Sequence, residues 1–123
     1  DPRQVVKNWL FLNNANEACL PVIVEKNKPM IFREWIPGQS MIKGTFNIDV
    51  PHPKNRILIP NILLVPTLGF NQKNFRLGYG GGYYDRTIPQ YKALTIGLCF
   101  EHGKCCDIAE EKHDMALDLV IIG

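Results

Sequence analysis

The chain has 123 residues, which is enough for one compact domain with a single apolar core. Hydrophobic residues make up 46% and charged residues 21%, a balance that is ordinary for a globular protein and argues against disorder. The formal net charge of +2 is too small to predict nucleic acid or a membrane surface as a partner, and no apolar run is long enough to cross a bilayer.

The cysteine pattern does not predict a disulfide framework. Cys105 and Cys106 are adjacent, Cys99 lies in an apolar stretch, and Cys19 is far from the others in sequence. We therefore expect a protein of the reducing cytoplasm. The first residue is Asp1 rather than Met, so we expect the chain to be part of a longer protein.

The N-terminal half is predicted as a helix, two strands and a long loop. Apolar residues recur at helical spacing from Val5 to Asn14. Two short strands are expected next, Cys19 to Val24 and Met30 to Trp35, joined by the polar turn Glu25 to Lys28. Residues 37–61 are rich in proline and glycine and are predicted as a long loop, which within a compact domain is more often functional than idle.

The C-terminal half is predicted to supply a central sheet. Apolar runs at Ile62 to Val65, Leu94 to Phe100 and Leu119 to Ile122 are continuous, which is typical of strands covered on both faces. A short helix is expected from Tyr83 to Ile88, and residues 110–115 are expected to be a polar connection. The predicted fold is α/β, a three-layer sandwich whose helices flank a central parallel or mixed sheet, in a single domain spanning residues 1–123.

The most informative segment is a glycine-rich turn, RLGYGGGYYDR, at residues 76–86. Its glycines allow close approach of the backbone to a ligand, and their N–H groups can form an anion nest beside a helix N-terminus. Arg76 and Arg86 bracket the turn with guanidinium groups suited to phosphate or carboxylate. The spacing matches neither a Rossmann fingerprint nor a P-loop, so a phosphate-binding loop and a structural turn both stay open.

Three side chains of this turn have a functional and a structural interpretation. Asp85 is a candidate magnesium ligand, because one carboxylate beside a phosphate nest is sufficient, but Asp at such a position more commonly caps a helix. Tyr83 and Tyr84 suit stacking on a flat ring or hydrogen bonding, although packing is the commoner role of tyrosine.

The complete string RLGYGGGYYDR resembles the signature of the 5-formyltetrahydrofolate cyclo-ligases, also called methenyltetrahydrofolate synthetases. Further segments resemble that family in the same order along nearly the whole chain: CLPVI, FREWIPG, FNIDVPHP, LLVPTLGF and EKHDMALDLVI. The resemblance implies an ATP- and magnesium-dependent ligase of one-carbon metabolism that converts 5-formyltetrahydrofolate to 5,10-methenyltetrahydrofolate. In the family's reaction the formyl oxygen attacks the γ-phosphate, N10 then attacks the activated carbon, and phosphate leaves.

The resemblance implies a nucleotide site and a catalytic pair. The residues that it places at the nucleotide are Arg76, Gly78, Gly80, Gly81, Gly82, Tyr83 and Tyr84. Tyr84 resembles the tyrosine near the formyl group and phosphate, and Arg76 is its implied catalytic partner. Asn74 stands where the family often has glycine, and asparagine is tolerated there because it accepts turn geometry.

A metal site and a folate site are implied as well. Asp85 and Asp114 resemble the two magnesium ligands of the family. Phe46, Trp35 and Tyr84 are candidates for contacts with the folate, while core packing is the alternative interpretation of Trp35. The implied partners are the small molecules 5-formyltetrahydrofolate and ATP, with no nucleic acid and no membrane, and the expected state is a monomer.

The chain departs from the family at its start. Family members have an N-terminal helix with Lys and Arg for the ATP phosphates, then a strand and a Glu that contacts substrate, ahead of a DPR-like segment. Because Asp1-Pro2-Arg3 opens this chain, we expect that N-terminal segment to be missing from it. The alternative functions are a non-catalytic nucleotide- or folate-binding module and an inactive fragment of the enzyme.

Two other interpretations have little support in the residues. A zinc site built from His102, Cys105, Cys106 and His113 would fit no standard ligand spacing. A nucleic-acid-binding domain would carry a basic stripe, and none is visible in the sequence.

Overall fold

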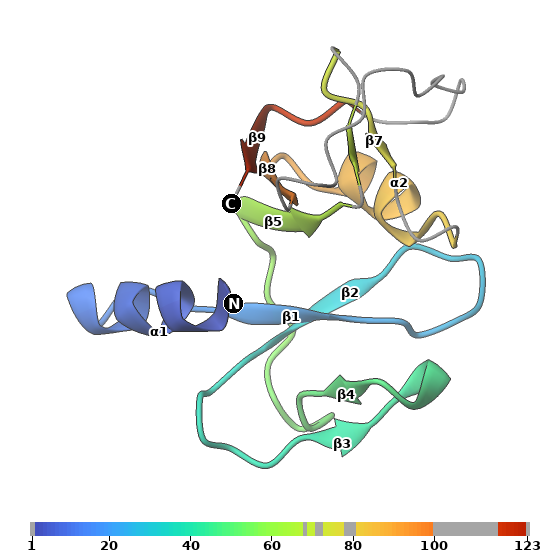
Figure 1. Ribbon diagram of the computed structural model, residues 1–123. Coiled ribbons are helices and arrows are strands. Elements are labelled where there is room, and N and C mark those ends of the chain that lie inside the picture. The colour runs from blue at the N-terminus through green and yellow to red at the C-terminus, as the bar shows by residue number, and fades with distance from the viewer. Residues whose placement is uncertain (1, 68, 71–72, 78–80, 100–115, 123) are drawn as a thin grey trace. The chain divides into compact units, whose positions relative to one another are not determined.

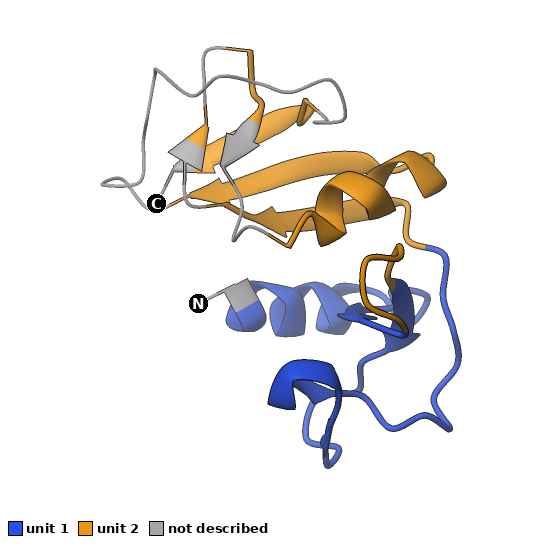
Figure 2. Cartoon of the chain, turned by 90° about the vertical axis from the view of Figure 1, so that its right-hand side faces the viewer, with its two compact units in different colours: residues 1–24, 31–59 blue, residues 25–30, 60–123 orange. Residues whose placement is uncertain are grey.

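Figure 1 shows the computed structural model of the chain, which describes residues 2–67, 69–70, 73–77, 81–99 and 116–122. The chain forms two compact units, coloured separately in Figure 2. Unit 1 consists of Asp1–Val24 and Ile31–Ile59, and unit 2 consists of Glu25–Met30 and Pro60–Gly123. That residues 1–123 make up a single domain stays a prediction.

Unit 1 contains the predicted helix and strand pair. Its elements are α1 (Pro2–Leu12), β1 (Cys19–Val22), β2 (Ile31–Glu34), β3 (Ile42–Lys43), the 3₁₀ turn η1 (Thr45–Asn47) and β4 (Asp49–Val50). The α1 helix ends where asparagine side chains bind the backbone, since Asn16 Nδ2 donates to Trp9 O at 2.8 Å and Asn13 Oδ1 accepts from Ala15 N–H at 2.8 Å. The strands β1 and β2 pair antiparallel, as the two apolar runs and their polar turn predict.

Residues 37–61, the region predicted as a long, punctuated loop, contain two short strands and the 3₁₀ turn η1. Strands β3 and β4 form a short antiparallel hairpin, in which Lys43 lies opposite Asp49 and forms an ion pair with it at 2.7 Å. Further along, Leu58 N–H donates to Phe32 O at 2.9 Å, so this part of the chain runs beside β2. Two-residue strands are too short to show an alternating pattern, which is why the sequence does not reveal them.

Unit 2 contains the central sheet. Its elements are β5 (Ile62–Pro66), β6 (Gly69–Phe70), β7 (Arg76–Leu77), α2 (Tyr83–Thr87), the 3₁₀ turn η2 (Ile88–Gln90), β8 (Leu94–Cys99) and β9 (Leu119–Ile122). Strands β5, β8 and β9 form a parallel sheet in that order, which confirms the predicted α/β fold (Figure 1). The β6–β7 hairpin was not predicted, and the connection expected at residues 110–115 lies outside the described residues.

The two faces of the parallel sheet differ in exposure. One face carries Leu63, Val65, Thr95 and Cys99, which are at most 5% exposed. The other face is apolar too, but its side chains are 38% to 53% exposed at Ile62, Leu64, Leu94, Leu119 and Ile121. That this second face is covered, as continuous apolar strands indicate, stays a prediction.

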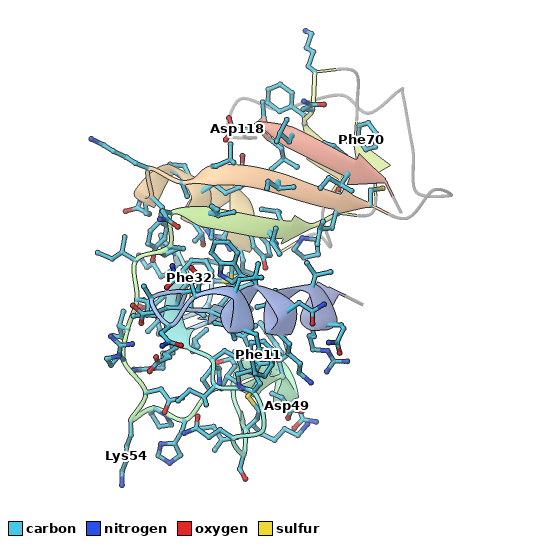
Figure 3. All side chains as sticks on the ribbon, turned by 90° about the vertical axis from the view of Figure 1, so that its left-hand side faces the viewer. Phe11, Phe32, Asp49, Lys54, Phe70 and Asp118 are labelled. Atoms are coloured by element: carbon cyan, nitrogen blue, oxygen red, sulfur yellow. The ribbon has the colours of Figure 1, made fainter. Side chains whose placement is uncertain are left out.

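Apolar side chains are also exposed on α1, where Phe11 is 90% exposed (Figure 3). In the described part of the chain, no helix combines the length and apolar character needed to cross a membrane. Cys19 and Cys99 are free thiols, and Cys105 and Cys106 lie outside the described residues.

Candidate functional site

The glycine-rich turn leaves the β6–β7 hairpin and leads into α2. Asn74, just before β7, has φ 63°, which is the left-handed geometry that asparagine tolerates. Phe75 pairs with Ala116, and Leu117 N–H donates to Asn74 O at 2.8 Å. These bonds hold the chain just before β9 beside the β6–β7 hairpin. The glycine-tyrosine string and the C-terminal segment, both of which resemble the family, therefore lie side by side although they are far apart in sequence.

The last two glycines of the turn are required by its geometry. Gly82 is the N-cap residue of α2 and has φ 69° and ψ 14°, in the left-handed region. A Cβ at Gly82 would lie 2.8 Å from Arg86 Nη1, and a Cβ at Gly81 would lie 2.8 Å from the Tyr83 ring. Any side chain at these positions would therefore force neighbouring groups to move.

Arg86 folds back over the turn that precedes its helix. Its Nη2 donates to Gly81 O at 2.6 Å, and its guanidinium carbon lies 4.9 Å from the centre of the Tyr83 ring, a cation–π distance. Its Nε is shielded from solvent and has no hydrogen-bond partner among the described residues. The sequence suggests Arg86 as a group for phosphate or carboxylate, whereas the structure uses its guanidinium to hold Gly81 against α2.

Tyr84 and Asp85 are half-buried in the first turn of α2. Since Gly82 is the N-cap residue, the interpretation of Asp85 as the helix cap is wrong, although its charge is favourable near a helix N-terminus. Asp85 Oδ1 is shielded from solvent. A carboxylate oxygen is the ligand type that Mg²⁺ prefers, so the donor at Asp85 fits that ion.

Several predicted site residues are placed only in part. Arg76 lies in β7 with its backbone opposite Phe70. Gly78, Gly80 and Asp114 lie outside the described residues, and so do the four residues of the zinc site considered in the sequence analysis. Within the part of the chain that the structure describes, no group of three or more His, Cys, Asp or Glu side chains could hold a metal ion.

The two predicted folate-side aromatics belong to unit 1. Trp35 is half-buried directly after β2, and its backbone N–H donates to Ala18 O at 2.8 Å. Phe46 lies in η1 at the tip of the β3–β4 hairpin, is 62% exposed and has φ 59°. An exposed aromatic residue in the left-handed region is strained, and strain of this kind gathers at ligand sites.

Sequence reasoning missed two polar contacts between residues far apart in sequence, one at α2 and one at β9. Thr87 is fully buried at the end of α2, where Met30 N–H donates to its hydroxyl at 2.9 Å. Asp118, which directly precedes β9 (Figure 3), accepts hydrogen bonds from the N–H and the hydroxyl of Thr95 at 2.8 and 3.1 Å. No sequence pattern marks these contacts, because their partners are 57 and 23 residues apart.

Known proteins similar to this chain include 5-formyltetrahydrofolate cyclo-ligases and 5,10-methenyltetrahydrofolate synthetases. A model of the 5-formyltetrahydrofolate cyclo-ligase family matches residues 4–123. The 5-formyltetrahydrofolate cyclo-ligase of Haemophilus influenzae is 29% identical over 122 residues, which cover 93% of this chain and 65% of that protein. The solved structure of a 5,10-methenyltetrahydrofolate synthetase from Mycoplasma pneumoniae matches with a TM-score of 0.68 and 28% identity, over 94% of this chain and 60% of that one.

A second solved structure, the 5,10-methenyltetrahydrofolate synthetase of Aquifex aeolicus, has a TM-score of 0.78 at 22% identity and shows the shared fold. It is matched over 99% of this chain and 61% of its own length, so this chain spans somewhat less than two thirds of these relatives. The family model, by contrast, matches this chain from residue 4 to its last residue. This chain therefore belongs to the 5-formyltetrahydrofolate cyclo-ligase family.

Proposed function

We propose that the protein catalyses the ATP- and magnesium-dependent cyclisation of 5-formyltetrahydrofolate to 5,10-methenyltetrahydrofolate, and that this chain supplies its nucleotide and magnesium end. The observation that carries the proposal is the family match over residues 4–123. The geometry of the turn supports it, because a Cβ at Gly81 would lie 2.8 Å from the Tyr83 ring and Gly82 has a left-handed backbone that favours glycine.

Nucleotide binding is proposed for the glycine-rich turn, residues 76–84. Support comes from Gly82, whose left-handed backbone starts α2 without a side-chain cap, so the N–H groups of the first helical turn receive no hydrogen bond from the side chain of the cap residue. Arg86 holds Gly81 O, which orients the peptide that follows Gly81. An anionic phosphate near such N–H groups would be stabilised by the same partial charges that favour anions at helix N-termini.

Magnesium binding is proposed for Asp85 and Asp114. Asp85 fits by its donor type and by its place next to the proposed nucleotide turn. Asp114 lies outside the described residues and is proposed on the family resemblance; Ala116, two residues further along the chain, pairs with Phe75, one residue before Arg76. The ion would neutralise charge on the transferred phosphoryl group.

In the proposed reaction the formyl oxygen attacks the γ-phosphorus and the bond to the β–γ bridging oxygen breaks, which releases ADP. N10 then attacks the formyl carbon and loses its proton, and phosphate departs with the former formyl oxygen. We assign Tyr84 and Arg76 to the reacting groups, and Phe46 and Trp35, with Tyr84, to the folate. Most of the rate enhancement would come from positioning, since phosphorylation turns a poor leaving group into a good one.

We further propose a monomer that acts on these small molecules in a reducing cytoplasm, with no nucleic acid or membrane partner. The free thiols of Cys19 and Cys99 and the low net charge of +2 support that assignment.

The proposal is tested by incubating the complete gene product with 5-formyltetrahydrofolate, ATP and Mg²⁺ and following methenyltetrahydrofolate by its absorbance. Product that requires both ATP and Mg²⁺ supports the ligase, and the absence of ATP-dependent product overturns it. Calorimetry with ATP and with the folate distinguishes the remaining alternative, since binding without turnover identifies a non-catalytic binding module.

A further inference from the structure

Thr87 is the most completely enclosed polar side chain of the described residues, with 0% exposure. Its hydroxyl accepts a hydrogen bond from Met30 N–H at 2.9 Å and donates one to Tyr83 O at 2.5 Å. Both hydrogen-bonding directions of the hydroxyl are therefore in use. A buried hydroxyl with this arrangement is costly to replace, because removing it leaves a buried N–H unsatisfied.

Met30 is held from a second side as well. It is 5% exposed, and its carbonyl accepts from the Tyr91 hydroxyl at 3.4 Å. Thr87 and Tyr91 stand at the two ends of η2, so the segment that follows the glycine-rich turn binds both backbone polar groups of Met30. Met30 thus serves as a fixed point, 57 residues away in sequence, for the end of α2.

The α2 helix needs such a fixed point because it has only five residues. Helices much shorter than about 12 residues are not stable by themselves in water, so tertiary contacts must set the direction of α2. Tyr84 and Asp85 lie within the span that the Thr87 hydroxyl bridges, between Tyr83 O and Thr87 itself. A change in this bridge would rotate or shift both side chains.

We propose that Thr87 is a positioning residue for the ligase reaction: its hydroxyl, bound to the amide of Met30, sets the orientation of α2 and with it the placement of Tyr84 and Asp85. The inference rests on the proposed function and adds to it a residue that does not touch the substrates. A shift of about 1 Å at reacting groups can lower a rate by roughly 100-fold, so a buried hydroxyl outside the site can control turnover.

The test compares three variants in the complete gene product. Thr87→Val keeps the shape but removes the hydroxyl, and Thr87→Ser keeps the hydroxyl but removes the methyl group. Val65→Ala is the control for lost stability, because Val65 is a fully buried core residue of β5 without a side-chain hydrogen bond. We expect Thr87→Val to lower kcat/KM about tenfold or more and to raise the Mg²⁺ concentration for half-maximal rate, while Thr87→Ser stays within about threefold of wild type.

Amide hydrogen exchange supplies a readout that needs no substrate. Thr87→Val should speed exchange at Met30 and in α2, and Val65→Ala should not do so selectively. The inference is overturned if Thr87→Val keeps the wild-type rate and Mg²⁺ dependence, or if Val65→Ala with an equal fall in Tm loses as much activity. If the wild-type protein shows no turnover, the proposed function fails and the inference fails with it. If the wild-type protein turns over normally and Thr87→Val has the same rate, the inference alone is refuted.

Discussion

Gly82→Ala should weaken both the glycine-rich turn and the activity, for two reasons that can be separated. The residue has φ 69°, and an L-residue in the left-handed region costs about 1 to 2 kcal/mol. In addition the new Cβ would lie 2.8 Å from Arg86 Nη1, so the guanidinium must shift from its present position over the turn. The loss of its hydrogen bond to Gly81 O and of its contact with the Tyr83 ring lowers the free energy of unfolding by about 1 kcal/mol more. This value is near the low end of the range for such contacts, because Arg86 is partly exposed.

Gly38→Ala is the matched control for this change. Gly38 has φ 87°, but a Cβ there would have no atom within 4 Å, so the substitution carries the backbone strain without the clash. Urea unfolding should show a loss of about 2 to 3 kcal/mol for Gly82→Ala and about 1 to 2 kcal/mol for Gly38→Ala. In the ligase assay only Gly82→Ala should lower kcat/KM substantially. Wild-type stability and activity in Gly82→Ala, or equal loss of activity in both variants, would refute the assignment of the turn to the site.

Three further outcomes are expected. Tyr84→Ala should lower turnover by about 100-fold or more while the circular dichroism spectrum stays that of wild type, because the side chain is only half-buried; an active variant removes Tyr84 from the reaction. Asp85→Ala should raise the Mg²⁺ requirement so that excess Mg²⁺ partly restores the rate, whereas Asp49→Ala, at an exposed surface ion pair, should not; an unchanged requirement in Asp85→Ala excludes the ligand role. Burial and the charge of Glu17 raise the pKa of Cys19 from its ordinary value near 9 to about 11. The folded state thus keeps the proton more tightly than the unfolded state, and the contribution of Cys19 to stability should be constant below pH 9 and fall as the pH rises toward 11. Cys19→Ala should reduce the loss of stability between pH 9 and pH 11, and an unchanged pH profile in the variant would contradict this prediction.

The family and the main elements of the fold could be predicted from the sequence because they depend on local patterns. Helical spacing marked α1, continuous apolar runs marked β5, β8 and β9, and the string from Arg76 to Arg86 marked the family. The β3–β4 and β6–β7 hairpins were missed, since strands of two residues carry too few positions for a period to be visible. Both hairpins pair through the backbone, and Lys43 forms an exposed ion pair with Asp49 across β3 and β4.

The glycine-rich turn has some features that the sequence predicts and others that only the tertiary structure reveals. By itself the sequence determined that residues 76–86 are rich in glycine, carry two arginines and match the signature of the family. Only the tertiary structure decided that Arg86 binds back onto Gly81 and that Thr87 anchors α2 to Met30. The physical reason is that a buried donor must find an acceptor wherever the fold brings one, and a partner 57 residues away leaves no local signal in the sequence.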